Sequence, residues 1–422
     1  MTRIDEALDW IHSRLKFNIR PGLSRVEALL DRLEHPDRSL SMIHVAGTNG
    51  KGSTVAFTAS IFREAGLRVA TFTSPFIVSF GERMSINSEP IPDERLITYV
   101  DLMKPMVEEM DSIDELAGVT EFEIITAMAF KYFADETVDL AIIEVGLGGL
   151  LDSTNVILPE LTAITTIGLD HVDILGDSYE AIASQKAGII KDKVPLVTGN
   201  IIPEAMAVID ETAKQHASRH YRYGQDYKLN YDGNPEERFD FEGQGMRLSG
   251  LVKGLQGKHQ IENAGMAIEM SLIYARQKGI ELSEDLISKA VAKAFWPGRM
   301  EEIAPSVFID GAHNVHAIRR LIDNLETEFA GKKLRLLFSA ITTKDIGQML
   351  DLLKAVPGAS LSLTTFDYPK ALALEDFKGS GLTLVEDWYE EVDKEIQKDE
   401  ILIVTGSLYF ISQVRAYLLS KD

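Results

Sequence analysis

A glycine-rich loop between a short apolar segment and a helical segment most constrains the fold of this chain. Residues 41–47 (SMIHVAG) are typical of a buried strand, and the loop Gly47–Ser53 (GTNGKGS) leads into a helical stretch that ends near Gly66. Glycines let a backbone wrap around phosphate oxygens, a helix N-terminus presents free N–H groups, and Lys51 adds a positive charge. The pattern therefore predicts a phosphate-binding loop within an α/β domain.

The loop departs from the common pattern G-x-x-x-x-G-K-[ST] at two positions. Val45 stands where that pattern has glycine, and Gly52 separates Lys51 from the hydroxyl groups of Ser53 and Thr54. Either hydroxyl can reach a Mg²⁺ ion. The alternative is a glycine-rich turn with a solvated lysine, but the flanking strand and helix favour the phosphate loop.

Strand and helix signals alternate along the rest of the first half, as they do in βαβ units. Asp139–Val145 (DLAIIEV) is apolar enough to be buried on both faces of a sheet. A helical stretch covers residues 178–186. The other strands predicted here are Arg68–Thr73, Thr162–Ile167 and Val194–Thr198.

The pattern changes after about residue 220. Aromatic, glycine and charged residues mix without a helical period over residues 220–255, which predicts a small antiparallel excursion. Helical patterns resume over residues 260–278 and 283–294, and the segment WPGRM at 296–300 is the best linker candidate. Beyond it, helical stretches alternate with four apolar segments: SVFID, LRLLFSA, SLSLTTF and ILIVTG.

These signals predict an α/β protein of two domains. Residues 1–295 are expected to form a P-loop ATPase-type domain with a mostly parallel sheet. Residues 296–422 are expected to form a smaller, Rossmann-like α/β domain. We expect the active site in the cleft between the two domains, because α/β folds bind ligands at strand ends.

Composition restricts the partners and the compartment. The 422 residues carry a net charge of −22, which argues against a nucleic-acid partner because its phosphates would be repelled. The chain has no cysteine, so disulfides and thiolate sites are excluded. It has no apolar run near the ~18 residues of a membrane span, and its N-terminal segment has acids where a secretory signal is apolar. We expect a cytoplasmic protein with no membrane partner.

Polar residues at the ends of predicted strands are the next candidates. Glu144 ends a strand and suits a magnesium ligand or a base, although a plain strand-end acid is an equal alternative. Glycines 146, 148 and 149 behind it indicate a close approach of the backbone. His171, which follows Asp170, suits a metal ligand, a base or a hydrogen-bonded loop residue.

Other candidates are less distinctive by themselves. Lys186 lies on a helical stretch, where a lysine is usually solvated. In the second domain, Asp310 and His313 follow a strand, and Arg299 beside the linker can reach a phosphate. Two further strand-end strings are Lys344-Asp345 and Thr405-Gly406-Ser407.

Taken together and in this order, the motifs resemble those of the folylpolyglutamate synthases, a branch of the Mur ligase superfamily. The resemblance covers nearly the whole chain. Its strings are HVAGTNGKGS, TSPFIVSFGERM, VTEFEIITAMAFKYF, IIEVGLGG, LDSTNV, LDHVDILG, IASQKAGIIK, HQIENA, WPGRME, DGAHN, KD and VTGSLYF. Leu150, Gln185 and Val315 depart from residues that are frequent in the family. None is a proposed metal ligand, so the departures bear only on substrate preference.

The resemblance implies a magnesium-dependent nucleotide site. Ser53, Glu144 and His171 are implied as Mg²⁺ ligands, with Ser74 close by. Lys186 is implied to carry a carbamate whose oxygen binds a second Mg²⁺; a neutral lysine amine can add carbon dioxide. K⁺ is a further candidate cofactor.

The resemblance also implies where the substrates bind. The set implied for ATP is Thr48, Asn49, Gly50, Lys51, Gly52, Ser53, Asn263, Arg299 and Asp310. The set implied for the folate, mostly in the loop Thr73–Met84, is Ser74, Phe76, Arg83 and Phe122. His313 and Ser407 are implied to lie near the incoming glutamate. The candidate catalytic residues are Lys51, Lys186, Asp310 and His313.

The implied activity is an ATP-dependent ligase that joins L-glutamate to the γ-carboxylate of (tetrahydro)folate through an acyl-phosphate. Dihydrofolate synthesis stays open as a second activity. The expected partners are folate, L-glutamate and ATP, and we expect a monomer. One alternative is another Mur-type ligase, although the cell-wall enzymes have a domain of about a hundred residues before the loop. The others are a P-loop ATPase without ligase function and an inactive binding protein.

Overall fold

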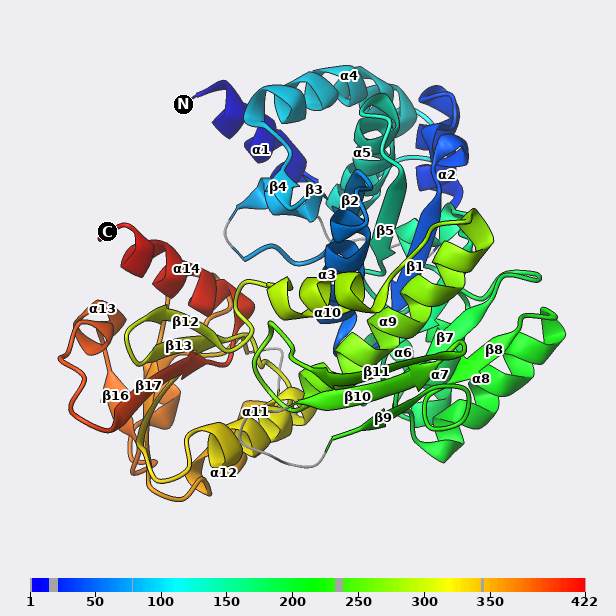
Figure 1. The fold of residues 1–422 in the computed structure, drawn as a ribbon. Helices are drawn as coiled ribbons and strands as arrows, with labels where there is room; N and C mark the ends of the chain where they lie inside the picture. Colours follow the sequence, from blue (N-terminus) through cyan, green and yellow to red (C-terminus); the bar gives the residue numbers. More distant parts are fainter. Residues whose placement is uncertain (1, 15–21, 78, 232–237, 343–344, 422) are drawn as a thin grey trace. The chain divides into compact units, whose positions relative to one another are not determined.

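The computed structural model describes residues 2–14, 22–77, 79–231, 238–342 and 345–421. The chain divides into two compact units (Figure 1). The first contains the chain up to Tyr231 together with Arg238–Val252 and Glu262–Ala294. The second contains Lys253–Ile261 and Phe295–Asp422. Each unit is built on a mostly parallel sheet with helices, so the predicted fold class of two α/β domains is confirmed.

The first unit is built around an eight-stranded sheet in the order β4-β3-β2-β5-β1-β6-β7-β8. The six strands β2-β5-β1-β6-β7-β8 run parallel to their neighbours. At the other edge, β3 is antiparallel to β2, and β4 is antiparallel to β3. The strands are β1 Met42–Ala46, β2 Val69–Phe72, β3 Met84–Ile86, β4 Glu89–Pro90, β5 Leu140–Glu144, β6 Leu161–Ile164, β7 Leu196–Thr198 and β8 His220–Arg222. The buried central strands explain the continuous apolar segments of the sequence.

Helices pack on this sheet through separate apolar cores. One core joins α1 (Arg3–Ser13), α2 (Ser24–Arg32), α4 (Asp93–Asp111) and α5 (Glu121–Asp135) to β1, β2 and β5. A second core lies under α7 (Tyr179–Ala187) and α8 (Pro203–Gln215). The remaining helices of this unit are α3 Lys51–Glu64, α6 Val172–Leu175, α9 His259–Lys278, which begins in the second unit's segment, and α10 Glu284–Lys293. The predicted helix after the glycine loop is thus α3.

The predicted antiparallel excursion is confirmed as a three-stranded sheet beside α9 (Figure 1). Its strands are β9 Lys228–Asn230, β10 Phe239–Gly243 and β11 Met246–Leu251. Gln244 and Gly245 connect β10 to β11 with φ values of 50° and 79°. Two consecutive positive φ values are typical of the tight hairpin turn that matches strand twist.

The second unit has a six-stranded sheet in the order β12-β13-β17-β14-β15-β16. All neighbours are parallel except β12, which runs antiparallel to β13. The strands are β12 Glu301–Ala304, β13 Val307–Asp310, β14 Lys333–Phe338, β15 Ala359–Thr364, β16 Thr383–Val385 and β17 Glu400–Thr405. The helices are α11 Val315–Glu328, α12 Ile346–Lys354, α13 Trp388–Val392 and α14 Leu408–Leu419. The four apolar segments predicted here are β13, β14, β15 and β17.

Among the described residues there are also four short 3₁₀ helices: η1 Pro36–Ser39, η2 Phe80–Arg83, η3 Ser153–Val156 and η4 Leu374–Phe377. The Ser74–Pro75 peptide bond is cis. In the described ranges, we find no helix that combines the length and the apolar character needed to cross a membrane.

Candidate active site

The glycine loop between β1 and α3 can follow its path only because two of its residues lack a side chain. Gly47 has a φ of 151°, and a Cβ added to it would lie 1.8 Å from Thr165 Oγ1. Gly50, the N-cap of α3, has a φ of 87°, and its added Cβ would lie 2.5 Å from Asn263 Oδ1. The loop therefore leaves its N–H groups and the start of α3 open to an anion, with Asn263 beside Gly50.

Two threonines that follow β6 hold this loop in place. The Thr48 N–H donates to the Thr166 carbonyl at 2.8 Å, and the Asn49 N–H donates to Thr166 Oγ1 at 3.0 Å. Thr165 Oγ1 donates to the Asn49 carbonyl at 2.7 Å. Sequence reasoning did not single out these threonines, although both stand in the string TAITTIG.

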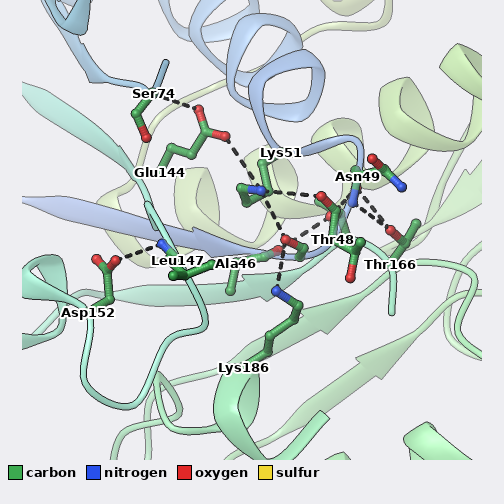
Figure 2. A network of polar contacts seen from close by, with 12 residues as sticks. Ala46, Thr48, Asn49, Lys51, Ser74, Glu144, Leu147, Asp152, Thr166 and Lys186 are labelled. Atoms are coloured by element: carbon green, nitrogen blue, oxygen red, sulfur yellow. Dashed lines mark hydrogen bonds and ion pairs between the residues drawn. The ribbon is translucent and has the colours of Figure 1, made fainter. Parts of the chain in front are cut away.

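Lys51 and Glu144 lie next to one another beside the glycine loop (Figure 2). Lys51 Nζ donates to the Gly47 carbonyl at 3.0 Å and lies 3.9 Å from Glu144 Oε1. The Ser74 N–H donates to Glu144 Oε2 at 3.4 Å. Ser53 lies in the first turn of α3 and is 3% exposed. The strand-end acid thus lies beside the loop lysine, in a buried position suited to bind a cation held with phosphate.

Lys186 is buried, so its interpretation as a solvated helix lysine is wrong. The residue is 4% exposed, and its Nζ donates to the Gly47 carbonyl at 3.1 Å. Burial, together with the nearby charge of Lys51, lowers the pKa of Lys186 to about 7, while Asp170 and Asp152 oppose the shift. A substantial part of this amine is therefore neutral near pH 7, and a neutral amine is nucleophilic.

Asp152 fixes the glycine-rich segment that follows β5. Its Oδ2 accepts from the Leu147 N–H at 2.8 Å, and its Oδ1 accepts from the N–H and hydroxyl of Thr154 at 3.0 and 2.5 Å. His44 Nε2 lies 2.8 Å from the same hydroxyl. Burial raises the pKa of Asp152, while these donors oppose the shift. The string LDSTNV contains Asp152, yet sequence reasoning assigned it no role.

The segment that Asp152 holds lies against both Phe122 and α7. A Cβ on Gly146 would lie 2.5 Å from the Phe122 ring, and a Cβ on Gly149 would lie 2.6 Å from the Gln185 carbonyl oxygen. The Leu150 N–H donates to that same carbonyl at 2.7 Å. The close approach predicted from these glycines is confirmed.

Gly149→Ala tests whether this close approach matters. We expect the added methyl group to displace the Lys186 turn, since it would lie 3.0 Å from Lys186 Cα as well as against the Gln185 carbonyl. Overpacking of this kind lowers the free energy of unfolding by about 1–3 kcal/mol, and we expect turnover to fall with it. Urea denaturation and steady-state ligation measure both.

The matched control is Gly347→Ala on the exposed face of α12, where an added Cβ meets only Asp345 Oδ1 at 3.9 Å. Replacing a helical glycine by alanine raises the free energy of unfolding by about 0.5–1 kcal/mol. Equal stabilities for the two variants would mean that the Gly149 backbone contact imposes no constraint.

The predicted folate loop contains a cluster of aromatic side chains around an arginine. The Arg83 guanidinium lies over the rings of Phe76 and Phe80 at 5.3 and 5.1 Å, and it forms an ion pair with Glu121 at 3.1 Å. Phe122 follows Glu121 in α5, which begins there because Thr120 and Glu123 form a capping box. The structure thus brings Phe76 and Arg83 together. Val78 of the same loop lies outside the described residues.

His171 lies after β6, with a φ of 51° and a side chain that is 44% exposed. Its Nε2 is 4.0 Å from Asp170 Oδ1. The negative charge of Asp170 raises the pKa of Lys186, so this pair lies near the buried amine. The metal-ligand role of His171 stays a prediction.

The side chains beside the loop suit a Mg²⁺ ion that also binds substrate phosphates better than a metal ion bound only by protein side chains. Within the described ranges, no three His, Cys, Asp or Glu side chains are grouped as a metal cluster. Glu144 supplies a carboxylate, and Ser53 and Ser74 carry hydroxyl groups. Mg²⁺ commonly takes one or two carboxylates and completes its shell with substrate phosphates and water. This donor set therefore fits a magnesium ion that arrives with a nucleotide.

In the second unit, the predicted residues gather at the carboxyl end of β13 and β17. Asp310 lies opposite Thr405 in register, and its carboxylate accepts from the N–H groups of Met300 and Ala312 at 3.0 and 2.9 Å. His313 Nδ1 lies 2.8 Å from the Gly311 carbonyl. Ser407, the N-cap of α14, is 2% exposed. These three residues thus share one edge of the sheet.

Of the remaining predicted pair, Lys344-Asp345, the structure describes only Asp345. Asp345 caps α12, because its Oδ1 accepts from the Gln348 N–H at 3.1 Å. Lys344 lies outside the described residues. Arg299 lies close to the same sheet edge, since a Cβ on Gly311 would be 3.4 Å from Arg299 Nη1.

Comparisons with known proteins agree with this geometry. The family model of the Mur ligase middle domain matches residues 45–271, and that of the Mur ligase glutamate ligase domain matches residues 298–408. The chain is 41% identical to the dihydrofolate synthase/folylpolyglutamate synthase of Bacillus subtilis, with 99% of each chain covered. It is 37% identical to the folylpolyglutamate synthase of Lacticaseibacillus casei, with 98% of each covered.

Solved structures give the same result. The apo form of L. casei FPGS matches with a TM-score of 0.88 at 36% identity, covering 99% of this chain and 100% of that one. Mycobacterium tuberculosis folylpolyglutamate synthase complexed with ADP matches with a TM-score of 0.90 at 29% identity, covering 99% and 98%. An FPGS–AMPPCP–folate complex matches with a TM-score of 0.87 at 35% identity, covering 99% and 100%.

Proposed function

The chain belongs to the folylpolyglutamate synthase family of the Mur ligases, and we propose that it uses ATP to join L-glutamate to the γ-carboxylate of a folate. The observation that carries the proposal is the convergence of Lys51 and Lys186 on the Gly47 carbonyl, beside Glu144. This arrangement joins a phosphate loop, a cation-binding carboxylate and a buried amine. The similar complex with AMPPCP and folate supports the choice of substrates.

The proposed reaction has two steps. A γ-carboxylate oxygen of the folate attacks the γ-phosphorus of ATP, the bond to the bridging oxygen breaks, and ADP leaves. The amine of glutamate then attacks the acyl carbon of the acyl-phosphate and loses a proton as inorganic phosphate leaves. Lys51 stabilises the charge that spreads over the transferring phosphoryl oxygens. Mg²⁺, when bound, neutralises phosphate charge and aligns the phosphates.

The protein's own groups fulfil the remaining tasks in this proposal. The N–H groups of the loop and Asn263 hold the nucleotide, with Arg299 and Asp310 as its contacts in the second unit. Phe76, Arg83 and Phe122 hold the folate, while His313 and Ser407 orient the glutamate. Shielding the acyl-phosphate from water is necessary because it hydrolyses readily.

We infer in addition that Lys186 becomes a carbamate. The neutral amine attacks the carbon of carbon dioxide, a C–N bond forms as one C–O π bond opens onto its oxygen, and the nitrogen loses a proton to solvent, so a neutral amine becomes an anion. Burial and the lowered pKa of about 7 support this step. A protonated amine 3.1 Å from the Gly47 carbonyl would repel a nearby metal ion, whereas a carbamate would attract it. The carbamate would serve a second Mg²⁺, and K⁺ remains a further candidate cofactor.

A second activity, dihydrofolate synthesis, is favoured by the name of the B. subtilis relative, which combines both functions. Both reactions consume ATP and glutamate and differ only in the acceptor. We therefore expect glutamate-dependent ADP release with tetrahydrofolate, and the same assay with dihydropteroate decides the second activity. ADP release that is equal with and without a pterin acceptor would contradict the ligase proposal and indicate a P-loop ATPase.

A further inference from the structure

A strained turn in the linker between residues 297 and 301 determines where Arg299 lies. Gly298 has a φ of 65°, and Met300 has a φ of 44°. A positive φ is uncommon for a residue with a side chain and persists only where the surroundings impose it. The two left-handed residues flank Arg299, so whatever holds the turn also sets the direction in which this side chain leaves the backbone.

Two carboxylates hold the turn, one at each end. Glu301 Oε2 accepts from the Gly298 N–H at 2.7 Å, and Asp310 Oδ2 accepts from the Met300 N–H at 3.0 Å. The Gly311 N–H also donates to the Gly298 carbonyl, at 2.9 Å. Asp310 already has a predicted role at the nucleotide, whereas Glu301 has none.

Glu301 is held in turn by Arg415 of α14. Arg415 Nε lies 3.0 Å from each oxygen of the Glu301 carboxylate, and Nη2 lies 2.9 Å from Oε1. The side chains are 13% and 7% exposed, so this charge-assisted contact is little screened by solvent. Figure 1 shows α14 beside β12, which begins at Glu301. The last helix of the chain is thus connected to the backbone of the linker turn.

The turn directs Arg299 over the end of β13. Arg299 Nη1 lies 3.4 Å from the point that a Cβ on Gly311 would occupy. The Arg299 charge lowers the pKa of Asp310, opposing the rise that burial causes. The guanidinium therefore stands beside the sheet edge that carries Asp310, His313 and Ser407.

We propose that Glu301 and Arg415 form a positioning pair that orients Arg299 toward the phosphates of the nucleotide. The inference rests on the proposed function, in which Arg299 contacts ATP. It adds that the affinity for ATP depends on two residues that do not touch the nucleotide themselves. A pair that served only to attach α14 to β12 would affect folding but would not act through Arg299.

A double-mutant cycle distinguishes these two roles. We expect Arg415→Met to raise the KM for ATP by about tenfold, within the coupling range of residues in one network, while the KM for folate stays unchanged. Arg299→Ala should raise the KM for ATP at least as much. In the Arg299→Ala background, Arg415→Met should have no further effect, because the side chain that it positions is absent. Arg415→Lys, which keeps the charge but not the fork geometry, should restore part of the loss.

The matched control is Arg335→Met in β14. Arg335 forms comparably buried ion pairs with Glu391 at 2.6 Å and with Glu400 at 3.4 Å, in the same unit. We expect it to lower the melting temperature as Arg415→Met does but to leave the KM for ATP unchanged. If Arg415→Met does not fold, Arg415→Lys replaces it in the cycle.

The outcomes separate the inference from the proposed function. Additive losses in the double variant, or a rise in the KM for ATP in Arg335→Met equal to that in Arg415→Met, would overturn the positioning role alone. An unchanged KM for ATP in Arg299→Ala would overturn the nucleotide role of Arg299 and the inference with it.

Discussion

Lys51→Ala is expected to lose the ligase reaction. Its Nζ lies within hydrogen-bond distance of the Gly47 carbonyl and 3.9 Å from Glu144, at the start of the helix that would hold the phosphates. Removing a preorganised charge from a transition state of this kind typically costs a factor of about 10²–10³ in rate. The measurement is kcat for glutamate-dependent ADP formation at saturating MgATP, with nucleotide binding followed separately.

The control for this variant is Lys289→Ala on α10, whose side chain is 57% exposed and pairs with Glu64. An exposed ion pair contributes about 0–1 kcal/mol to stability, so this change should leave turnover as it was. Turnover close to that of the unmodified protein in Lys51→Ala would remove the assignment of Gly47–Ser53 as a phosphate loop.

Lys186→Ala is the second variant expected to lose the reaction, for a different reason. If the residue is a carbamate, alanine removes an anionic oxygen ligand rather than a cation. Short carboxylic acids added to the medium should then restore part of the activity by supplying a carboxylate in the vacated space. An electron-density map of the wild-type protein should show three additional heavy atoms on Lys186 Nζ.

Two comparisons make this test specific. Lys186→Met keeps most of the buried volume without an amine, so its loss of activity would not result from a cavity. If Lys186→Ala were fully active, the carbamate role would be wrong at this position. Rescue of Lys186→Ala by simple amines but not by carboxylic acids would point to a cationic role instead.

The pH dependence follows from the lowered pKa of Lys186, about 7. Below this value the amine in the folded protein is protonated and cannot add carbon dioxide. If carbon dioxide is removed from the protein and then returned, the activity that is recovered should therefore fall as pH falls through 7. The same shift affects stability. Between about 7 and the ordinary value of 10.5 the unfolded chain binds more protons than the folded one, so the unmodified protein gains stability as pH rises through this window.

The sequence predicted those features that depend on local signals. Strand β1 and α3 follow from apolar periodicity. The loop between them follows from its glycines, which adopt a positive φ without the cost that a side chain brings. The strand-end position of Glu144 and Asp310 follows from the same alternation. These elements need no knowledge of the rest of the chain.

Burial and long-range contacts could not be predicted in the same way. Lys186 looks like any helix lysine until α7 places its amine against the Gly47 carbonyl, 139 residues earlier in the chain. Arg415 and Glu301 are separated by 114 residues, and nothing in the periodicity of α14 distinguishes that arginine from a solvated one. The role of Asn263 came from the family resemblance alone, whereas Arg299 was singled out from the residues only as a cation beside the linker. Asp152 is a similar case, because its hydrogen bonds to Leu147 and Thr154 form only when the segment after β5 folds back.

The fate of ¹⁸O placed in the γ-carboxylate of the folate substrate tests the central claim most directly. In a reaction through an acyl-phosphate, one carboxylate oxygen becomes bonded to phosphorus and leaves with it when glutamate attacks the acyl carbon. We predict that the inorganic phosphate formed with ATP, glutamate and labelled tetrahydrofolate carries a single ¹⁸O atom for each amide bond made. Unlabelled phosphate, formed together with the glutamylated product, would contradict the mechanism proposed for this protein.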